Sequence, residues 1–307
     1  MPLLLVLSGA LASGRIRRGF GRGKAAQSVA SNYYLYLVWL TVYAVLGQLM
    51  GGPSPAGDLD GSLPALVQVL VPDTTLWFIY ALAVYVPVFI LARKASPSLV
   101  LAALGVVNVM CAMFAYEAEP SWLKVIRLAF YFAIGVYGKD LIFQLAATRN
   151  YALAGLGTAA AGALTALSMM PLPEVLHESL YLLRALAFTA ALIGITAVLV
   201  RFRPVATLGH WAGSRTLPIY VIHPLLIIGL SILAEGPLSG TLTAVADNTL
   251  LALIYPAVAT MIVVGACVLI EQLCHACRLQ APFRAPDRLM ARWGTRNSSE
   301  AIADATK

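Results

Sequence analysis

The sequence predicts an all-α fold, a polytopic bundle of transmembrane helices, from its composition and from the spacing of its apolar segments. Of the 307 residues, 60% are apolar and 11% are charged, and the mean hydropathy is +0.82. Soluble domains are about 45–50% apolar and about 25% charged, and one or two water-soluble cores cannot hide so much apolar surface. The composition therefore excludes soluble globular, disordered, collagen-like and disulfide-rich secreted proteins.

Eight segments are long and apolar enough to cross a bilayer, for which about 20 apolar residues are needed. They cover residues 33–50, 75–92, 97–115, 122–138, 151–170, 180–200, 216–234 and 249–272. Connectors that are charged or rich in Gly and Pro separate these segments, and no internal repeat of the kind that marks many transporters is visible. We expect eight full spans.

A further apolar stretch, Met1–Ser13, opens the chain, and as a helix it covers only about 20 Å. We expect it to be a partial N-terminal span whose outer part is missing. The alternative is a signal peptide, because Ala10-Leu11-Ala12 is like a small-residue cleavage site. Against that alternative, no basic region precedes the apolar stretch, and the first basic cluster follows it.

Basic residues gather on one side of the predicted bundle. Eighteen of the 21 Lys and Arg fall in the stretch 15–24, in alternate connectors and in the C-terminal tail. Because such residues collect in cytoplasmic loops, we expect the C-terminus to lie in the cytoplasm of a cell whose plasma (inner) membrane holds the protein. The net charge of +7 then needs no nucleic-acid partner. We expect a membrane domain over residues 1–273 and a basic, disordered cytoplasmic tail over 274–307.

The four cysteines are too few for a disulfide scaffold. Cys274 and Cys277 form a C-x-x-C pair around His275, but no second pair is present to complete a tetrahedral zinc site. The sequence therefore predicts no metal site.

His223 differs from the other three histidines because it lies inside a predicted span. An ionisable group there is costly, so a functional role is the first hypothesis. The alternative is a histidine satisfied by a neighbouring helix. Tyr220 lies three residues earlier on the same helical face and could orient the imidazole by hydrogen bonding. Pro224 has no N–H for the Tyr220 carbonyl, which needs another partner.

The basic stretch after Ser13 anchors the topology and can also bind phosphate. Arg15 and Arg18 are three residues apart and share a face if the helix continues, with Arg17 between them. Guanidinium groups suit bidentate phosphate contact better than lysines do. A cytoplasmic donor that carries phosphates, such as a nucleotide or coenzyme A, would fit there.

Several stretches, in order along nearly the whole chain, resemble the acyltransferase family 3 membrane proteins, which modify bacterial surface sugars, lipids and antibiotics. The stretches are Met1-Pro2-Leu3 with Leu7-Ser8-Gly9, the basic stretch 15–24, Leu76-Trp77-Phe78-Ile79-Tyr80-Ala81-Leu82, Phe130-Tyr131-Phe132-Ala133-Ile134-Gly135, and Leu208-Gly209 followed by Ser214 and Leu217-Pro218-Ile219-Tyr220-Val221-Ile222-His223-Pro224. The last is similar to the family pattern LG…SLPIYLxHP.

The resemblance implies an O-acyltransferase that moves an acyl group, acetyl above all, from acyl-CoA to a hydroxyl of a cell-surface sugar or lipid-linked acceptor. Acyl-CoA is then a substrate, and no cofactor is tightly bound. Arg15, Arg17, Arg18 and Ser214 would bind the donor, and His223 and Tyr220 would serve catalysis. The alternatives are a multi-pass transporter or flippase and a non-catalytic membrane remnant.

The family's first helix, which carries an R/K-x10-H motif with a histidine thought to be the base, has no counterpart here. We expect it to lie upstream of Met1, omitted by a late start site or lost by truncation. Whether the chain as given is active therefore stays open.

Overall fold

The computed structural model describes residues 1–20, 23–50, 65–114, 120–148, 151–235, 249–277, 279 and 281–286, and across these ranges every regular element is a helix. The helices are α1 (Pro2–Arg18), α2 (Lys24–Met50), α3 (Ala65–Gln68), α4 (Trp77–Leu91), η2 (Ala92–Lys94), α5 (Pro97–Phe114), α6 (Ser121–Tyr137), α7 (Lys139–Thr148), α8 (Tyr151–Leu167), α9 (Glu174–Leu199), α10 (Arg203–Gly213), α11 (Thr216–Glu235) and α13 (Thr249–Ala276). The all-α prediction is confirmed.

Within the described residues, fewer helices than the eight predicted spans are long and apolar enough to cross a membrane. Within the described ranges, four helical stretches qualify, namely Lys24–Gly47, Trp77–Lys94, Glu174–Leu199 and Leu253–Ala276. A fifth qualifies if α10 and the first part of α11, which meet at an angle of 71°, count as one broken span. The predicted spans over 97–115 and 151–170 coincide with shorter apolar helices. The structure supports a membrane protein but does not confirm eight spans.

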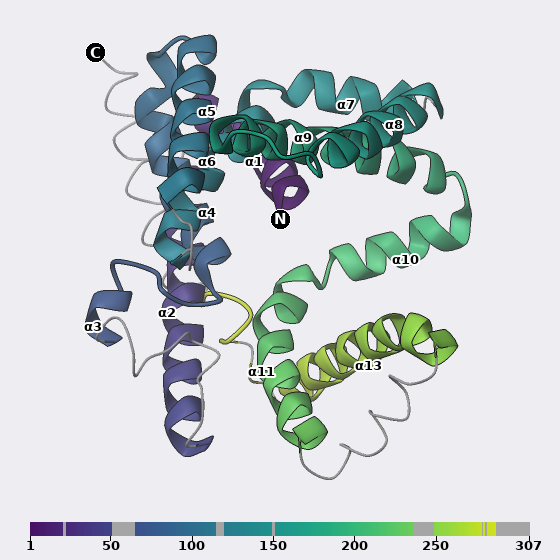
Figure 1. Cartoon of the computed structure of the whole chain (residues 1–307). Helices are drawn as coiled ribbons and strands as arrows, with labels where there is room; N and C mark the ends of the chain where they lie inside the picture. The colour runs from purple at the N-terminus through teal and green to yellow at the C-terminus, as the bar shows by residue number, and fades with distance from the viewer. Residues whose placement is uncertain are drawn as a thin grey trace, which may run out of the picture.

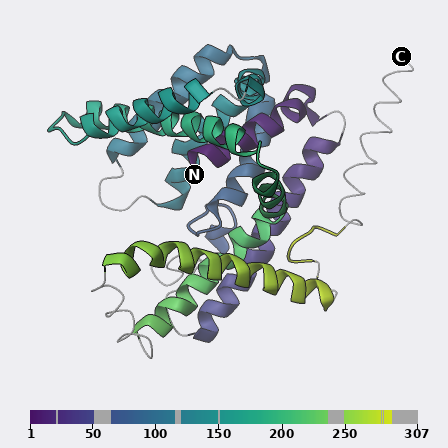
Figure 2. The ribbon, with the colours of Figure 1, turned by 90° about the vertical axis from the view of Figure 1, so that its right-hand side faces the viewer.

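The side chains form two apolar clusters that share α4, whose place among the helices is seen in Figure 1. The first cluster joins α1, α4 and α6, with α5 and α9 packed against it. The second joins α2, the start of α4, α11 and α13. The long helix α2 begins beside the first cluster and ends beside the second (Figure 2).

Helix α1 crosses α6 with the two backbones in contact. Gly9 and Gly135 meet there, and a Cβ atom on Gly135 would lie 2.0 Å from the carbonyl oxygen of Val6. Small residues allow such close approach in helix bundles. Helix α1 ends at Gly19, whose φ of +68° favours glycine, and the chain then turns towards α2.

The C-terminal part of the chain, as far as the structure describes it, extends α13 and then returns to the helical body. Helix α13 continues past residue 273 to Ala276. Residues 281–286 then return to α2, where Ala285 is buried and the indole Nε1 of Trp39 donates a hydrogen bond to the Pro282 carbonyl at 2.6 Å. Phe283, which lies between Pro282 and Pro286, makes an apolar contact with Trp39. The basic composition of the tail does not indicate this contact. Residues 287–307 lie outside the described ranges.

Candidate functional site

His223 lies in the first half of α11, and its imidazole is held by its own helix. The Nδ1 atom is 3.0 Å from the carbonyl oxygen of Ile219. Because a carbonyl can only accept, this contact selects the tautomer with the proton on Nδ1. The lone pair of Nε2 is then available, and no other described residue bonds to it. The side chain is thus positioned as a proton acceptor.

Tyr220 packs against His223 but does not hydrogen-bond it as predicted. The two ring centroids are 6.0 Å apart. The Tyr220 hydroxyl instead donates to the carbonyl of Thr75 at 2.5 Å and accepts the N–H of Phe78 at 3.3 Å. Phe78 lies in the first turn of α4 and Thr75 lies in the turn just before it, so both partners are far from Tyr220 in sequence. Tyr220 therefore fastens α11 to α4 and fixes the wall against which the imidazole rests.

Replacing Tyr220 with phenylalanine is expected to lower the free energy of unfolding by about 1–3 kcal/mol, because two hydrogen bonds are lost, one to the carbonyl of Thr75 and one from the N–H of Phe78. Thermal unfolding in detergent measures the change. Replacement of the exposed Tyr151 by phenylalanine is the matched control, since its hydroxyl accepts a surface contact from Arg201. Equal midpoints for the two variants would contradict this role for Tyr220.

His223 and Tyr220 together line two cavities. An apolar cavity of about 590 Å³ lies between α11 and α13, with Ile219, Val263 and Leu4 in its wall. A second cavity, of about 410 Å³, is lined by α4, α6 and α11 and includes the polar groups of Thr75, Ser121 and Lys124. We call them the apolar cavity and the polar cavity. The imidazole is shared by the two.

A third cavity, the basic pocket, lies where α1, α2 and the C-terminal segment meet. It has a volume of about 490 Å³ and is lined by Arg15, Lys24, Gln27, Ser28, Ser31, Asn32, Arg284 and Ala285. Three of these residues are cations, and none of the described lining residues is acidic. The Nε of Arg15 is buried and has no hydrogen-bond partner among the described residues. Burial, and secondarily the nearby Arg18, lower the pKa of Arg15. The pocket has the character of an anion site.

The predicted donor-binding residues do not all meet there. Helix α1 continues to Arg18, so Arg15 and Arg18 share a face, but Arg18 does not line the basic pocket. Arg17 instead faces Asp140 at 3.6 Å and lines a separate cavity with Arg93. Ser214 is exposed at the break between α10 and α11, where its hydroxyl donates to the Trp211 carbonyl at 2.8 Å. Ser214 does not line the basic pocket.

The family of the chain follows from a comparison with family models. The model described as an acyltransferase domain, that of acyltransferase family 3, matches residues 1–271. The chain belongs to this family. No curated protein and no solved structure matches the chain. The acyltransferase domain includes Arg15, Ser214, Tyr220 and His223, whereas Arg284 of the basic pocket lies beyond its end.

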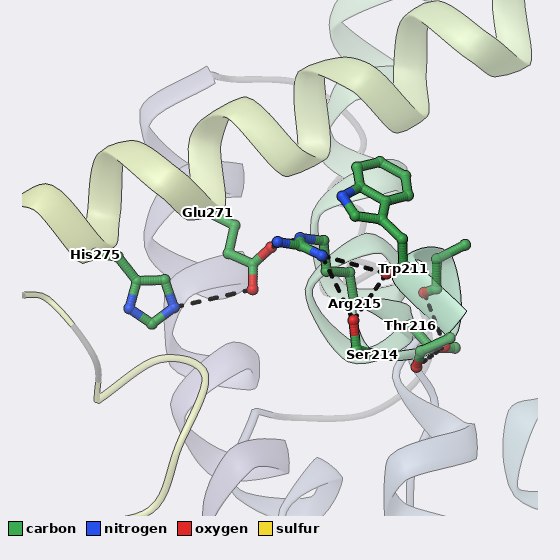
Figure 3. Close-up of polar contacts among 8 residues, drawn as sticks. Trp211, Ser214, Arg215, Thr216, Glu271 and His275 are labelled. Carbon is green, nitrogen blue, oxygen red and sulfur yellow. Dashed lines mark hydrogen bonds and ion pairs between the residues drawn. The ribbon is translucent and has the colours of Figure 1, made fainter. Parts of the chain in front are cut away.

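An ion-pair network near the α10–α11 break was not predicted from the sequence. Arg215 Nε lies 3.5 Å from a carboxylate oxygen of Glu271 on α13, and the other oxygen is 3.9 Å from His275 Nε2 (Figure 3). The Arg215 guanidinium also lies over the Trp211 ring, 5.0 Å from its centroid. These contacts join α10, α11 and α13 of the acyltransferase domain. The i, i+4 spacing of Glu271 and His275 was visible in the sequence, but the partner on α11 was not.

His275, which lies inside the C-x-x-C pair, therefore has a structural contact with Glu271. Its ring also stacks on Phe283, with centroids 6.1 Å apart. Across the described ranges, no group of three or more His, Cys, Asp or Glu side chains could hold a metal ion. Cys274 and Cys277 are free thiols.

Proposed function

We propose that this membrane acyltransferase moves an acyl group from acyl-CoA to a hydroxyl of a cell-surface sugar or lipid-linked acceptor. The observation that carries the proposal is the free Nε2 of His223 in the wall of two cavities. A histidine held in one tautomer by Nδ1 is arranged as a general base. The basic pocket at the far end of α1 supplies a place for the donor's phosphates.

Helix α1 sets the distance between the apolar cavity beside His223 and the basic pocket. Leu4 lines the apolar cavity and Arg15 lines the basic pocket. Eleven residues of helix correspond to about 16 Å along the axis. In acyl-CoA a flexible pantetheine arm separates the thioester from the phosphates. With the phosphates at Arg15, that arm would extend along α1 and bring the thioester towards His223.

The chemistry then needs one base and one acyl acceptor. The Nε2 of His223 takes the proton of the acceptor hydroxyl as its oxygen attacks the thioester carbonyl, and a tetrahedral intermediate forms. Collapse of the intermediate breaks the carbon–sulfur bond and forms the ester. The leaving thiolate of coenzyme A takes the proton back from the imidazolium. His223 ends neutral, ready for another turnover.

The two cavities divide the substrates between them. The acyl group, acetyl in the simplest case, fits the apolar cavity, whose wall includes Ile219 and Val263. The acceptor hydroxyl enters through the polar cavity, where Ser121 and Thr75 offer hydrogen bonds and Lys124 offers a positive charge. Tyr220 borders both and keeps α11 against α4. We place the protein in the plasma membrane with its C-terminus in the cytoplasm, as the distribution of basic residues predicts.

Binding of labelled acetyl-CoA to the purified protein tests the donor. We expect Arg15→Gln to weaken binding about tenfold, the loss of roughly 1.4 kcal/mol that a charge-assisted phosphate contact provides. Arg203→Gln is the matched control, because Arg203 is an exposed cation at the start of α10, outside the pocket. A wild-type protein that binds no acetyl-CoA would refute an acyl-CoA donor and favour a transporter or a non-catalytic protein.

A further inference from the structure

The C-terminal segment 281–286, which we call the strap, is seated on the helical body by specific contacts. The Trp39 indole donates to the Pro282 carbonyl at 2.6 Å. The Phe283 ring lies between two aromatic neighbours, 5.8 Å from Trp39 and 6.1 Å from His275 between centroids. Ala285 is 4% exposed. These contacts hold the strap in one place across α2.

The seating of the strap places a cation in the basic pocket. Arg284 follows directly after the anchored Phe283 and lines the pocket together with Arg15 and Lys24. The three side chains come from three different parts of the chain: the end of α1, the start of α2 and the strap. The pocket therefore gathers positive charge from three elements, and an anion bound among these side chains would be attracted by all three of them.

The number and type of groups favour a ligand with more than one phosphate. The pocket of about 490 Å³ offers two guanidinium groups, one ammonium, two serine hydroxyls and two side-chain amides. Guanidinium groups bind phosphate oxygens in pairs, and the hydroxyls and amides can complete the hydrogen bonding. Coenzyme A carries a pyrophosphate and a separate 3′-phosphate, so one ligand would meet all three cations.

We propose that the strap forms one wall of the donor site and that Arg284 binds a phosphate of coenzyme A there. This inference rests on the proposed function, and it adds a binding residue that lies outside residues 1–271, which the family model matches. The affinity for the donor then depends on the contact between Phe283 and α2, because that contact holds Arg284 in the pocket. Without that contact, the third cation leaves the pocket even though its charge remains in the chain.

The test compares dissociation constants for coenzyme A in nanodiscs of phosphatidylcholine, using the full chain. Arg284→Gln is expected to weaken binding about tenfold. Phe283→Ala, which keeps every charge, is expected to weaken it by a similar factor, and the exposed control Arg203→Gln is expected to leave it unchanged. Thermal unfolding of each variant identifies any that fails to fold. Wild-type affinity in Arg284→Gln or in Phe283→Ala would overturn the strap as part of the site.

Two further titrations answer separate questions. The first asks whether the strap binds an anion even if the proposed donor is wrong, and the second asks whether the pocket binds coenzyme A or a lipid headgroup. Inorganic pyrophosphate is titrated in parallel. If the wild type binds pyrophosphate through Arg284 but binds no coenzyme A, the donor of the proposed function fails while the strap remains an anion site. The titrations are repeated with phosphatidylglycerol in the nanodiscs. An unchanged affinity for coenzyme A supports the donor, whereas displacement by the anionic lipid overturns it.

Discussion

Replacing His223 with alanine is expected to reduce acyl transfer at least about a hundredfold, because a positioned general base contributes 10²–10⁴-fold. The protein should remain in the membrane at its normal level, since the lost hydrogen bond to the Ile219 carbonyl is local to α11. The measurement is transfer of label from acetyl-CoA to the envelope fraction of cells that produce the full chain, divided by the amount of protein. Unchanged transfer would contradict a catalytic role.

The asparagine variant separates a chemical role of His223 from a structural one. The side-chain amide nitrogen of His223→Asn can still donate to the Ile219 carbonyl, as Nδ1 does, but the variant has no basic nitrogen in place of Nε2. We therefore expect it to be as inactive as His223→Ala while unfolding at the wild-type temperature. Activity restored by asparagine would mean that the histidine only supports α11. His210→Ala, at an exposed site on α10, is the control.

Helical spacing predicted the contact between Tyr220 and His223, but not the partner of the tyrosine hydroxyl. Three residues of α-helix place two rings on one face, and their centroids are indeed 6.0 Å apart. The hydroxyl bonds to Thr75 and Phe78 because α11 packs against the start of α4. That packing depends on the tertiary arrangement and has no local signal in the sequence.

Helical geometry also explains why Arg17 does not line the basic pocket. Arg15 and Arg18 share a face of α1, whereas Arg17 is two residues, or about 200°, from Arg15 and so points to the opposite side. Helical periodicity by itself therefore separates Arg17 from Arg15 of the basic pocket, but it does not account for Arg18, which shares the face of Arg15 and does not line the pocket. Helical periodicity could not predict that Arg284 lines the pocket, because the position of Arg284 depends on the packing of Phe283 against Trp39. The one visible signal was an aromatic residue between prolines in a basic tail.

Hydropathy located the helices but did not determine how they cross the membrane. Each of the eight predicted spans overlaps a helix of the structure. Several helices are short, however, and α10 meets α11 at 71°. Tilt and bending are set by packing between helices, so an apolar stretch of suitable length does not specify them.

Adding one methyl group at Gly135 is expected to destabilise the protein by about 3 kcal/mol, the upper range for overpacking a tight core. The new Cβ would lie 2.0 Å from the Val6 carbonyl oxygen and 2.8 Å from the Ala10 nitrogen. Both are backbone atoms of α1, so no side chain can move aside. The helices α1 and α6 must separate, and the cluster around Leu5 and Phe132 would lose its packing.

Gly162→Ala is the matched control, because a Cβ there would meet nothing within 4 Å. In an exposed helix interior, alanine is favoured over glycine by about 0.8–1 kcal/mol, so this variant should unfold at an equal or higher temperature. The same chemical change therefore has opposite signs at Gly135 and Gly162. Equal midpoints for the two variants would mean that α1 and α6 are not in backbone contact. Because α1 carries both Leu4 and Arg15, Gly135→Ala should also weaken acetyl-CoA binding, whereas Gly162→Ala should not.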